Sequence, residues 1–229
     1  MINFHHHHHQ AVNHWGVYNL DKADNLPQQG YFSLGYHPWW LAEQYNWQCF
    51  VKKVKQSIEH PNFYAWGEIG LDRSCSIPLE KQFKLWDQLQ ELILGYPPRP
   101  VILHCVGAYA DFLSLLKPFK NFALIFHDYR GNTQLTEQFL RKYPNLCFSF
   151  GPEILKNDQK YRQTIELLAL EKLFLETDEK KMECLSDLYH CVAQIKGIKK
   201  ETLVQTILEN FKKKAPHSPS PEVSEGPKI

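Results

Sequence analysis

The sequence lacks the features that mark several large classes of protein. No apolar run approaches the roughly 20 residues of a membrane-spanning helix, and the amino terminus has neither the charged nor the apolar region of a signal peptide. The charges nearly cancel, with 26 Lys and Arg against 25 Asp and Glu, which excludes a strongly basic nucleic-acid coat protein and a polyacidic tail protein. We therefore expect a soluble protein with no membrane partner.

Closely spaced cysteines are also missing. The six cysteines form no C-x-x-C motif and no tight framework, so we expect reduced, mostly buried thiols in a cytoplasmic protein. No Gly/Ser linker and no internal repeat divides the chain, which predicts one domain over residues 1–214. Residues 215–229 hold four prolines and two large aliphatic residues, a composition that predicts a disordered carboxyl-terminal tail.

Short apolar runs alternate with longer amphipathic ones, a pattern typical of α/β proteins. The apolar runs predict eight strands, over residues 2–7, 16–20, 31–35, 64–69, 101–105, 122–126, 146–150 and 173–177. Helices are predicted over residues 47–59, 79–94, 109–116, 134–142, 159–168, 183–195 and 200–213. In the second of these helices the apolar stripe that should face a sheet is Phe83, Trp86, Leu89, Leu92 and Ile93.

The order of these elements predicts a (β/α)8 TIM-type barrel. Eight strands with helices between most of them suit that architecture, and the gaps after the first two strands are too short for a crossover helix. We therefore expect the first two βα units to be abbreviated. The alternative is a doubly wound open sheet, but histidines stand where its glycine-rich phosphate loop would lie.

Ionisable residues end one predicted strand after another. They are His5 and His7 on the first strand, His37 after the third, Glu68 on the fourth, His104 on the fifth, His127 after the sixth and Asp178 after the eighth. In a barrel these strand ends converge on one mouth, where catalytic residues lie. Each residue alone has a structural explanation, such as a hydrogen-bonded core histidine, an acceptor for loop amides or a helix N-cap. Together they indicate a metal site, because a buried imidazole or carboxylate must be paired or metal-bound.

The run of five histidines needs separate treatment, because it resembles an affinity tag. However, the apolar segment of residues 2–4 precedes it, and without these residues the barrel lacks its first strand. Alternate strand residues share a face, so His5, His7 and His9 point one way and His6 and His8 the other. Two histidines that are neighbours on one face, such as His5 and His7 or His6 and His8, are able to hold one metal ion.

Several motifs resemble those of the TatD family of metal-dependent deoxyribonucleases, which are amidohydrolase-like barrels. The resemblance covers about residues 1–213. Residues 3–7 match the motif D-x-H-x-H, with Asn3 in place of the aspartate, and residues 35–38 match G-[IV]-H-P. Residues 67–72 match G-E-[IT]-G-L-D, and residues 176–178 match E-T-D. The chain departs from the family where Cys105-Val106 replaces the usual Ser-Arg and where Glu179-Lys180-Lys181 follows E-T-D.

The resemblance implies two divalent ions, Zn²⁺, Mn²⁺ or Mg²⁺, and selects the register in which His5 and His7 bind metal. It implies that one ion is held by His5, His7 and Asp178, that the second is held by His104 and His127, and that Glu68 bridges them. Glu68 and Asp178 are then the catalytic residues, with Asp178 as general base. His37 is expected to bind substrate through a phosphoryl oxygen, or alternatively to cap its own loop.

The implied activity is metal-dependent hydrolysis of phosphodiester bonds in DNA. The substrate is then a nucleic acid or another phosphoester, and the chain is expected to be a monomer or a weak oligomer. A C–N or ester hydrolase is an alternative that commonly carries a carboxylated lysine where Glu68 stands. A non-catalytic metal-binding barrel is the second alternative.

Aromatic side chains flank the expected mouth, at residues 36–40 and at Tyr129-Arg130. They suit stacking of single-stranded bases, or alternatively form apolar lids over the barrel rim. The lysines at 52, 53, 55 and 212–214 are expected to be solvated helix faces.

Overall fold

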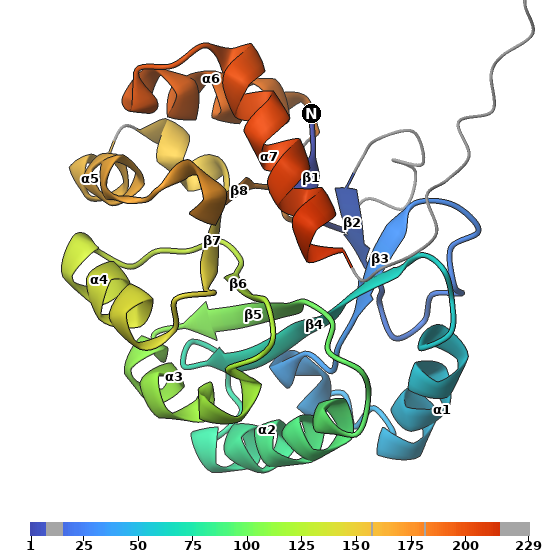
Figure 1. Ribbon diagram of the computed structural model, residues 1–229. Helices are drawn as coiled ribbons and strands as arrows, with labels where there is room; N and C mark the ends of the chain where they lie inside the picture. The colour runs from blue at the N-terminus through green and yellow to red at the C-terminus, as the bar shows by residue number, and fades with distance from the viewer. Residues whose placement is uncertain (8–15, 157, 181, 216–229) are drawn as a thin grey trace, which may run out of the picture.

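The computed structural model describes residues 1–7, 16–156, 158–180 and 182–215. Within these ranges eight parallel strands form one sheet in the order of the sequence, as Figure 1 shows. They are β1 (Asn3–His6), β2 (Gly16–Asn19), β3 (Tyr31–Leu34), β4 (Phe63–Asp72), β5 (Val101–Val106), β6 (Leu124–Phe126), β7 (Cys147–Phe150) and β8 (Leu173–Leu175). The predicted barrel of eight parallel strands is confirmed.

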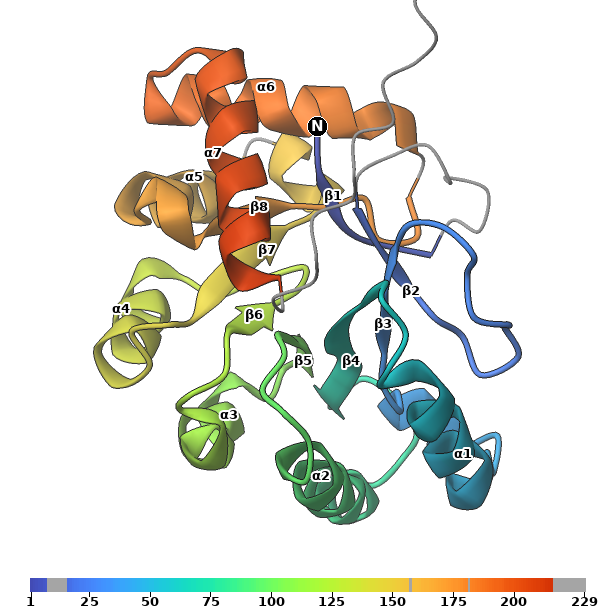
Figure 2. The same ribbon diagram turned by 45° about the vertical axis from the view of Figure 1, so that its right-hand side comes forward.

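Helices cover the outside of the strands. They are α1 (Trp47–Ser57), α2 (Leu79–Leu94), α3 (Tyr109–Leu115), α4 (Thr133–Lys142), α5 (Gln159–Leu167), α6 (Leu185–Lys196) and α7 (Lys200–Lys214). Figure 2 shows α1 to α5 following one another around the barrel. Residues 20–30, between β2 and β3, form turns and no helix, so this unit is abbreviated as predicted. Most of the connection between β1 and β2 lies outside the described residues.

The barrel closes where β1 meets the end of β8. His6 and Asp178 form a parallel bridge. The amide of Asp178 donates to the carbonyl oxygen of His5 at 3.1 Å, and the amide of His7 donates to that of Asp178 at 3.3 Å. These bonds place the ends of the first and last strands side by side, so that residues 5–7 and 178 share the same rim.

The strands are covered on both sides, which explains their nearly continuous apolar runs. All ten residues of β4 are buried. On α2, the buried stripe is Gln82, Leu85, Trp86, Leu89 and Ile93. Phe83 and Leu92 of the predicted stripe are only partly buried, but they also pack against the core. A glutamine lies in this stripe because it hydrogen-bonds the backbone of β4 at Asp72, accepting from the amide and donating to the carbonyl oxygen.

The amino-terminal end of the barrel is closed by α7. Phe211 stacks on Tyr64, at the start of β4, with ring centroids 4.5 Å apart, and its carbonyl oxygen accepts from the Tyr64 hydroxyl. Tyr31 at the start of β3 packs edge-on against the same phenylalanine ring. The ionisable residues predicted to form a site lie at the opposite, carboxyl-terminal end of the strands.

Some local predictions need correction. The sixth strand begins at Leu124, because Phe122 belongs to a turn in which its amide donates to the carbonyl oxygen of Phe119. Only Cys105 and Cys147 of the six cysteines are buried, so the expectation of mostly buried thiols is wrong. No helix in the described ranges is long and apolar enough to span a membrane. His8, His9 and residues 216–229 of the predicted tail lie outside the described residues.

Candidate metal centre

The carboxyl ends of the strands bring together the side chains that the sequence placed there. Three groups have ligand atoms within 4.8 Å of one another, and each is able to hold a metal ion. We call the following residues the histidine–carboxylate cluster: His5, His7, Glu68, His104, His127 and Asp178. Because they come from five different strands or strand ends, the whole barrel is needed to assemble the cluster.

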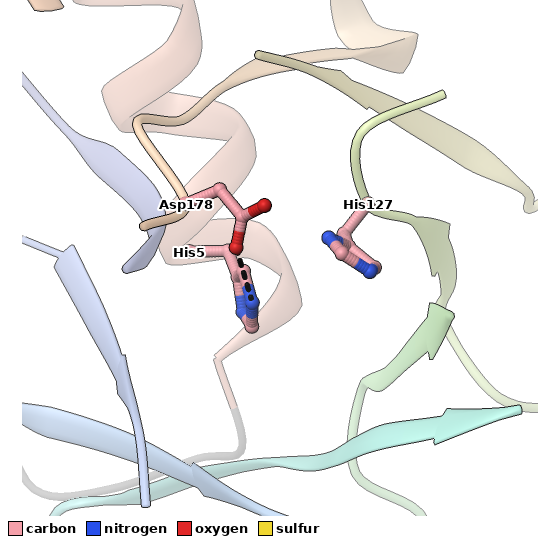
Figure 3. Close-up of side chains that lie close together, drawn as sticks. All are labelled: His5, His127 and Asp178. Carbon is pink, nitrogen blue, oxygen red and sulfur yellow. Dashed lines mark ion pairs between the residues drawn. The ribbon is translucent and has the colours of Figure 1, made fainter. Parts of the chain in front are cut away.

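Glu68 lies at the centre of this cluster, and its Oε2 atom faces the ends of β1 and β8. The His5 Nε2 atom lies 3.5 Å from Glu68 Oε2 and 3.7 Å from Asp178 Oδ1. His7 Nε2 lies 3.7 Å and 3.4 Å from the same two atoms. Figure 3 shows the Asp178 carboxylate directed at the His5 ring, with His127 on the opposite side.

The other carboxylate oxygen of Glu68 faces the ends of β5 and β6. His104 Nδ1 lies 2.7 Å from Glu68 Oε1, and His127 Nε2 lies 2.5 Å from it. The two ring nitrogens are 3.0 Å apart. Glu68 thus presents one oxygen to each of two groups of potential ligands.

His5 supplies the observation that tests whether metal fits. The side chain is fully buried, yet neither of its ring nitrogens has a hydrogen-bond partner in the described part of the chain. A buried polar group without a partner costs about 1–3 kcal/mol. A metal ion bound through Nε2 removes that cost for this nitrogen, and the histidine and carboxylate donors suit Zn²⁺, Mn²⁺ or similar divalent ions.

Two further carboxylates stand behind the histidines and orient their rings. His104 turns its Nε2 atom toward Asp72 Oδ2 at 3.3 Å, which leaves Nδ1 facing Glu68. His127 turns Nδ1 toward Glu176 Oε1 at 3.3 Å, which leaves Nε2 facing Glu68. A carboxylate that accepts the second N–H of a metal-binding histidine fixes the ring and its tautomer.

The G-E-I-G segment positions Glu68 because its two glycines allow neighbouring strands to approach closely. A Cβ atom on Gly70, whose φ is +156°, would collide with the carbonyl oxygen of His104 on β5. One on Gly67 (φ +136°) would lie 2.6 Å from the carbonyl oxygen of Ile102. Glycine tolerates both backbone conformations, so the strand on either side of Glu68 lies tightly against β5.

Asn19, at the end of β2, holds the carboxylate from the other side. Its Oδ1 atom accepts from the Glu68 amide at 3.0 Å, and its Nδ2 atom lies 3.4 Å from Glu68 Oε2. The Ser33 hydroxyl donates to the same Oδ1 atom at 3.1 Å. The orientation of Glu68 is therefore fixed by β2 and β3 as well as by β5.

His37 lies beside the cluster and also caps its own loop. Its Nδ1 atom accepts from the amide of Trp39 at 3.2 Å, at the start of the short 3₁₀ helix Pro38–Leu41. An accepting Nδ1 requires that a neutral ring carry its proton on Nε2, and this atom lies 3.7 Å from Glu68 Oε1. Burial lowers the pKa of His37 to about 3, so the ring is neutral at pH 7 and offers an Nε2–H donor to the mouth.

The charges of the cluster suit cations. Burial alone would raise the pKa of Glu68, but the charge of His127 and the hydrogen bond from His104 hold it well below its usual range. Burial lowers the pKa of His7, but its contacts with Asp178 and Glu68 outweigh this and raise the pKa to about 10. The metal-free protein therefore holds protons where the carboxylates attract positive charge.

Asp178 differs from Glu68 in exposure and in backbone conformation. Its side chain is 29% exposed, against 5% for Glu68, so it is the more accessible of the two carboxylates. Its φ of +53° lies in the left-handed region, which costs energy for a residue other than glycine and is concentrated at functional sites.

Of the two alternatives left open for Tyr129, base stacking is excluded. Its ring is buried against Phe126 and Phe148, so it offers no surface for a base. The expectation that Lys53 lies on a solvated helix face was wrong. The ammonium group of Lys53 is not freely solvated, because it donates to the carbonyl oxygens of Asp21 and Lys22 at 2.7 and 3.0 Å.

Sequence reasoning missed the supporting residues Asn19, Asp72 and Glu176. Asn19 could have been found in the same way as the other residues, because it is a polar residue at the end of a strand. Asp72 and Glu176 lie inside the G-E-I-G-L-D and E-T-D motifs, but nothing in the sequence indicates which histidine each one faces.

Fold and site together define a (β/α)8 barrel with a histidine–carboxylate cluster at its carboxyl-terminal mouth. Residues 9–214 match the sequence model of the TatD related DNase family, and the chain belongs to that family. The family suggested by the motifs is therefore confirmed. The matched range begins after His5 and His7, whose placement beside Glu68 comes from the structure.

Curated relatives are similar over about two thirds of this chain. It is 27% identical over 151 residues to the human 3'-5' RNA nuclease TATDN2, covering 64% of this chain and 19% of that protein. It is 29% identical over 167 residues to the 3'-5' ssDNA/RNA exonuclease TatD of Erwinia tasmaniensis, covering 69% of this chain and 61% of that protein. The chain thus spans less than two thirds of the length of these relatives.

Solved structures support the fold. The TatD homologue YJJV of Escherichia coli K12 matches with a TM-score of 0.75 and 23% identity over 87% of this chain and 85% of that one. A TatD family hydrolase of Entamoeba histolytica matches with a TM-score of 0.77 and 16% identity over 94% of this chain and 97% of that one.

Proposed function

We propose that this protein is a metal-dependent phosphodiesterase that hydrolyses single-stranded nucleic acid, with DNA as its first candidate substrate. The observation that carries the proposal is the position of Glu68 between two groups of ligands, with the unpartnered His5 ring on one side. Paired metal ions about 3.5–4 Å apart are a common arrangement for phosphate-ester cleavage. The names of the family and of the nuclease relatives agree with this chemistry.

In this proposal His5, His7 and Asp178 hold one divalent ion, His104 and His127 hold the other, and Glu68 binds both. When bound, such ions act as Lewis acids and lower the pKa of a coordinated water to near neutrality. Zn²⁺ and Mn²⁺ suit the histidine-rich donor set better than Mg²⁺ does.

Asp178 and His37 are the residues that handle the proton and the substrate. In the metal-free protein, contact with His7 and the charge of His127 outweigh burial and lower the pKa of Asp178 to about 2, so this carboxylate is ionised at neutral pH. In this proposal its exposed position makes it the group that accepts the proton of the attacking water. The Nε2–H group of His37 donates to a phosphoryl oxygen and stabilises the charge that develops there.

The C–N hydrolase alternative has no support in the comparisons, because the matching family and the curated relatives named above are nucleases. The end of β4 also carries Glu68 where such enzymes commonly use a carboxylated lysine. The non-catalytic barrel is distinguished from the proposed function by a direct assay.

The assay follows end-labelled single-stranded DNA and RNA after incubation with the chain and Zn²⁺, Mn²⁺ or Mg²⁺. We expect cleavage that stops when EDTA is added and that is lost in the double variant His5→Ala/His7→Ala. His190→Ala, an exposed histidine on α6, is the matched control and should cleave like the wild type. If the metal-loaded wild type cleaves neither strand, the proposed function is wrong and the non-catalytic barrel is the better account.

A further inference from the structure

Trp39 is an exposed aromatic residue at the rim of the histidine–carboxylate cluster. Its side chain is 49% exposed, whereas its neighbours Tyr36 and Trp40 are 3% and 7% exposed. Those two rings pack against each other and against Tyr45. The aromatic segment of residues 36–40 therefore consists of a buried cluster and one ring that remains available to a ligand.

The Trp39 ring is exposed but firmly held. Its indole N–H donates to Asp72 Oδ2 at 2.7 Å. The ring also meets the His37 ring edge-on, with centroids 5.0 Å apart at an interplanar angle of 89°. An aromatic ring that is already fixed loses little conformational entropy when a ligand covers it.

The Trp39 ring lies close to residues of the histidine–carboxylate cluster, where the proposed reaction takes place. Its centroid lies 6.4 Å from that of His104, and the Asp72 carboxylate contacts both rings through the same Oδ2 atom. The neighbouring His37 has its Nε2 atom 3.7 Å from Glu68. A group resting on Trp39 is therefore close to Glu68, where the proposed metal ions would bind a phosphodiester.

Val106 extends the apolar surface at the same rim. Val106 lies on β5, where it pairs with Asp72 of β4, and its side chain is also exposed. A flat apolar surface beside a charged cluster matches a nucleotide, whose planar base adjoins its charged phosphate. Stacking on an aromatic side chain tolerates every base because each has a π-face.

We propose that Trp39 is the stacking platform for the nucleobase next to the phosphodiester bond that is cleaved. This inference rests on the proposed function and adds the subsite that selects single strands, because a base within a duplex is already stacked between its neighbours. Trp39 is a specificity-determining residue in this proposal, and the chemistry remains with the cluster.

The test combines variants of the protein with variants of the substrate. Trp39→Ala removes the ring, and Trp39→Phe keeps a ring but removes the bond to Asp72. Leu94→Ala, an exposed leucine at the end of α2, is the control for loss of exposed apolar surface. Each protein is assayed on a single-stranded DNA and on the same strand with an abasic residue beside the cleaved bond.

For the intact strand, Trp39→Ala should lower kcat/KM by about 5- to 150-fold, the range that corresponds to the loss of one base stack. The kcat/KM of Trp39→Phe should stay within about 3-fold of the wild type, because a ring still supports the base. The kcat/KM of Leu94→Ala should stay within the same range, because this substitution leaves the rim unchanged. On the abasic strand, Trp39→Ala should match the wild type. An equal loss on both strands would overturn the proposal, because the ring would then act on something other than the base.

Binding of a fluorescently labelled strand, measured by anisotropy in EDTA, separates this inference from the proposed function. If the wild type cleaves DNA and Trp39→Ala binds and cleaves it equally well, Trp39 is not a stacking platform, whereas the proposed nuclease function is supported. If the wild type binds the strand without cleaving it, weaker binding by Trp39→Ala supports the platform and equal binding overturns it. If the wild type neither binds nor cleaves, both proposals fail.

Discussion

Asn3 and Thr177 are joined by two hydrogen bonds that link the first strand to the last. The Asn3 Nδ2 atom donates to the Thr177 hydroxyl oxygen at 2.8 Å, and the Thr177 amide donates to Asn3 Oδ1 at 2.9 Å. Both residues are fully buried. The asparagine that departs from the family motif therefore helps to close the barrel directly beneath the histidines.

This relationship predicts different results for two substitutions. Asn3→Asp keeps an acceptor for the Thr177 amide, so it should destabilise the fold less than Asn3→Ala does, and burial of its carboxylate should raise the pKa of the new side chain. Asn3→Ala leaves the buried amide without its partner, which costs about 1–3 kcal/mol. Chemical denaturation of both variants beside the wild type measures the free energy of unfolding. Equal destabilisation by Asp and Ala would contradict the pairing described here.

The metal-free protein should lose stability at alkaline pH. The pKa of His7 is raised from 6.5 to about 10, so its protonation stabilises the fold fully below pH 6.5, and this contribution is lost as pH rises through about 10. The pKa of Asp178 is lowered from 3.8 to about 2, so its contribution is present above pH 3.8 and is lost as pH falls through about 2. Both contributions are complete between these limits, from pH 3.8 to 6.5.

The measurement is the thermal unfolding midpoint of EDTA-treated protein at pH 5.5 and at pH 9.5. We expect a fall between the two pH values that is smaller in His7→Ala and unchanged in the control His190→Ala. Zn²⁺ or Mn²⁺ should raise the midpoint more at the higher pH, because the metal must displace the proton from the imidazole. A fall of the same size in His7→Ala would show that another group causes the pH dependence.

Asp72 should affect metal binding without touching the metal. Its Oδ2 atom accepts from His104, and its Oδ1 atom accepts from the amide and hydroxyl of Ser74. Asp72→Asn replaces one acceptor with a donor, so the His104 ring loses its orientation, and metal affinity should fall about 10- to 100-fold. Trp39→Phe removes another donor to Asp72 and should leave metal affinity unchanged. Competition with a chromophoric chelator measures both; equal affinities for Asp72→Asn and the wild type would refute the positioning role.

The geometry of parallel strands made part of the candidate site predictable from the sequence. His5, Glu68, His104 and His127 were predictable as neighbours because the carboxyl ends of barrel strands converge, whatever the loops between them do. The bounds of α2 were also predictable, since residues 79–94 are strongly amphipathic. Its buried glutamine was not, because the partner of Gln82 lies on another element.

Other features depend on tertiary contacts that no local pattern encodes. Trp39 and Trp40 are adjacent in sequence and identical in type, yet one is exposed and the other buried, because the 3₁₀ turn that starts after His37 points them in different directions. The tautomers of His104 and His127 are set by carboxylates 32 and 49 residues away.

The two central carboxylates should respond differently to substitution. Asp178→Asn keeps an oxygen that binds metal but accepts no proton at neutral pH, so we expect turnover to fall by roughly 10²–10⁴-fold with most of the metal retained. Glu68→Gln removes the charge that lies between the two groups of ligands, which leaves two cations close together with less compensation. It should therefore lose metal as well as activity.

The most direct test of the shared role of Glu68 is the number of divalent ions per chain after equilibration with Mn²⁺ or Zn²⁺ and removal of the free metal. Elemental analysis should find about two ions per chain in the wild type, as in paired-metal phosphodiesterases, about two in Asp178→Asn, and about one or fewer in Glu68→Gln. A Glu68→Gln protein that is folded and retains the full wild-type number of ions would contradict the account, because Glu68 would then not be the ligand that the two ions share.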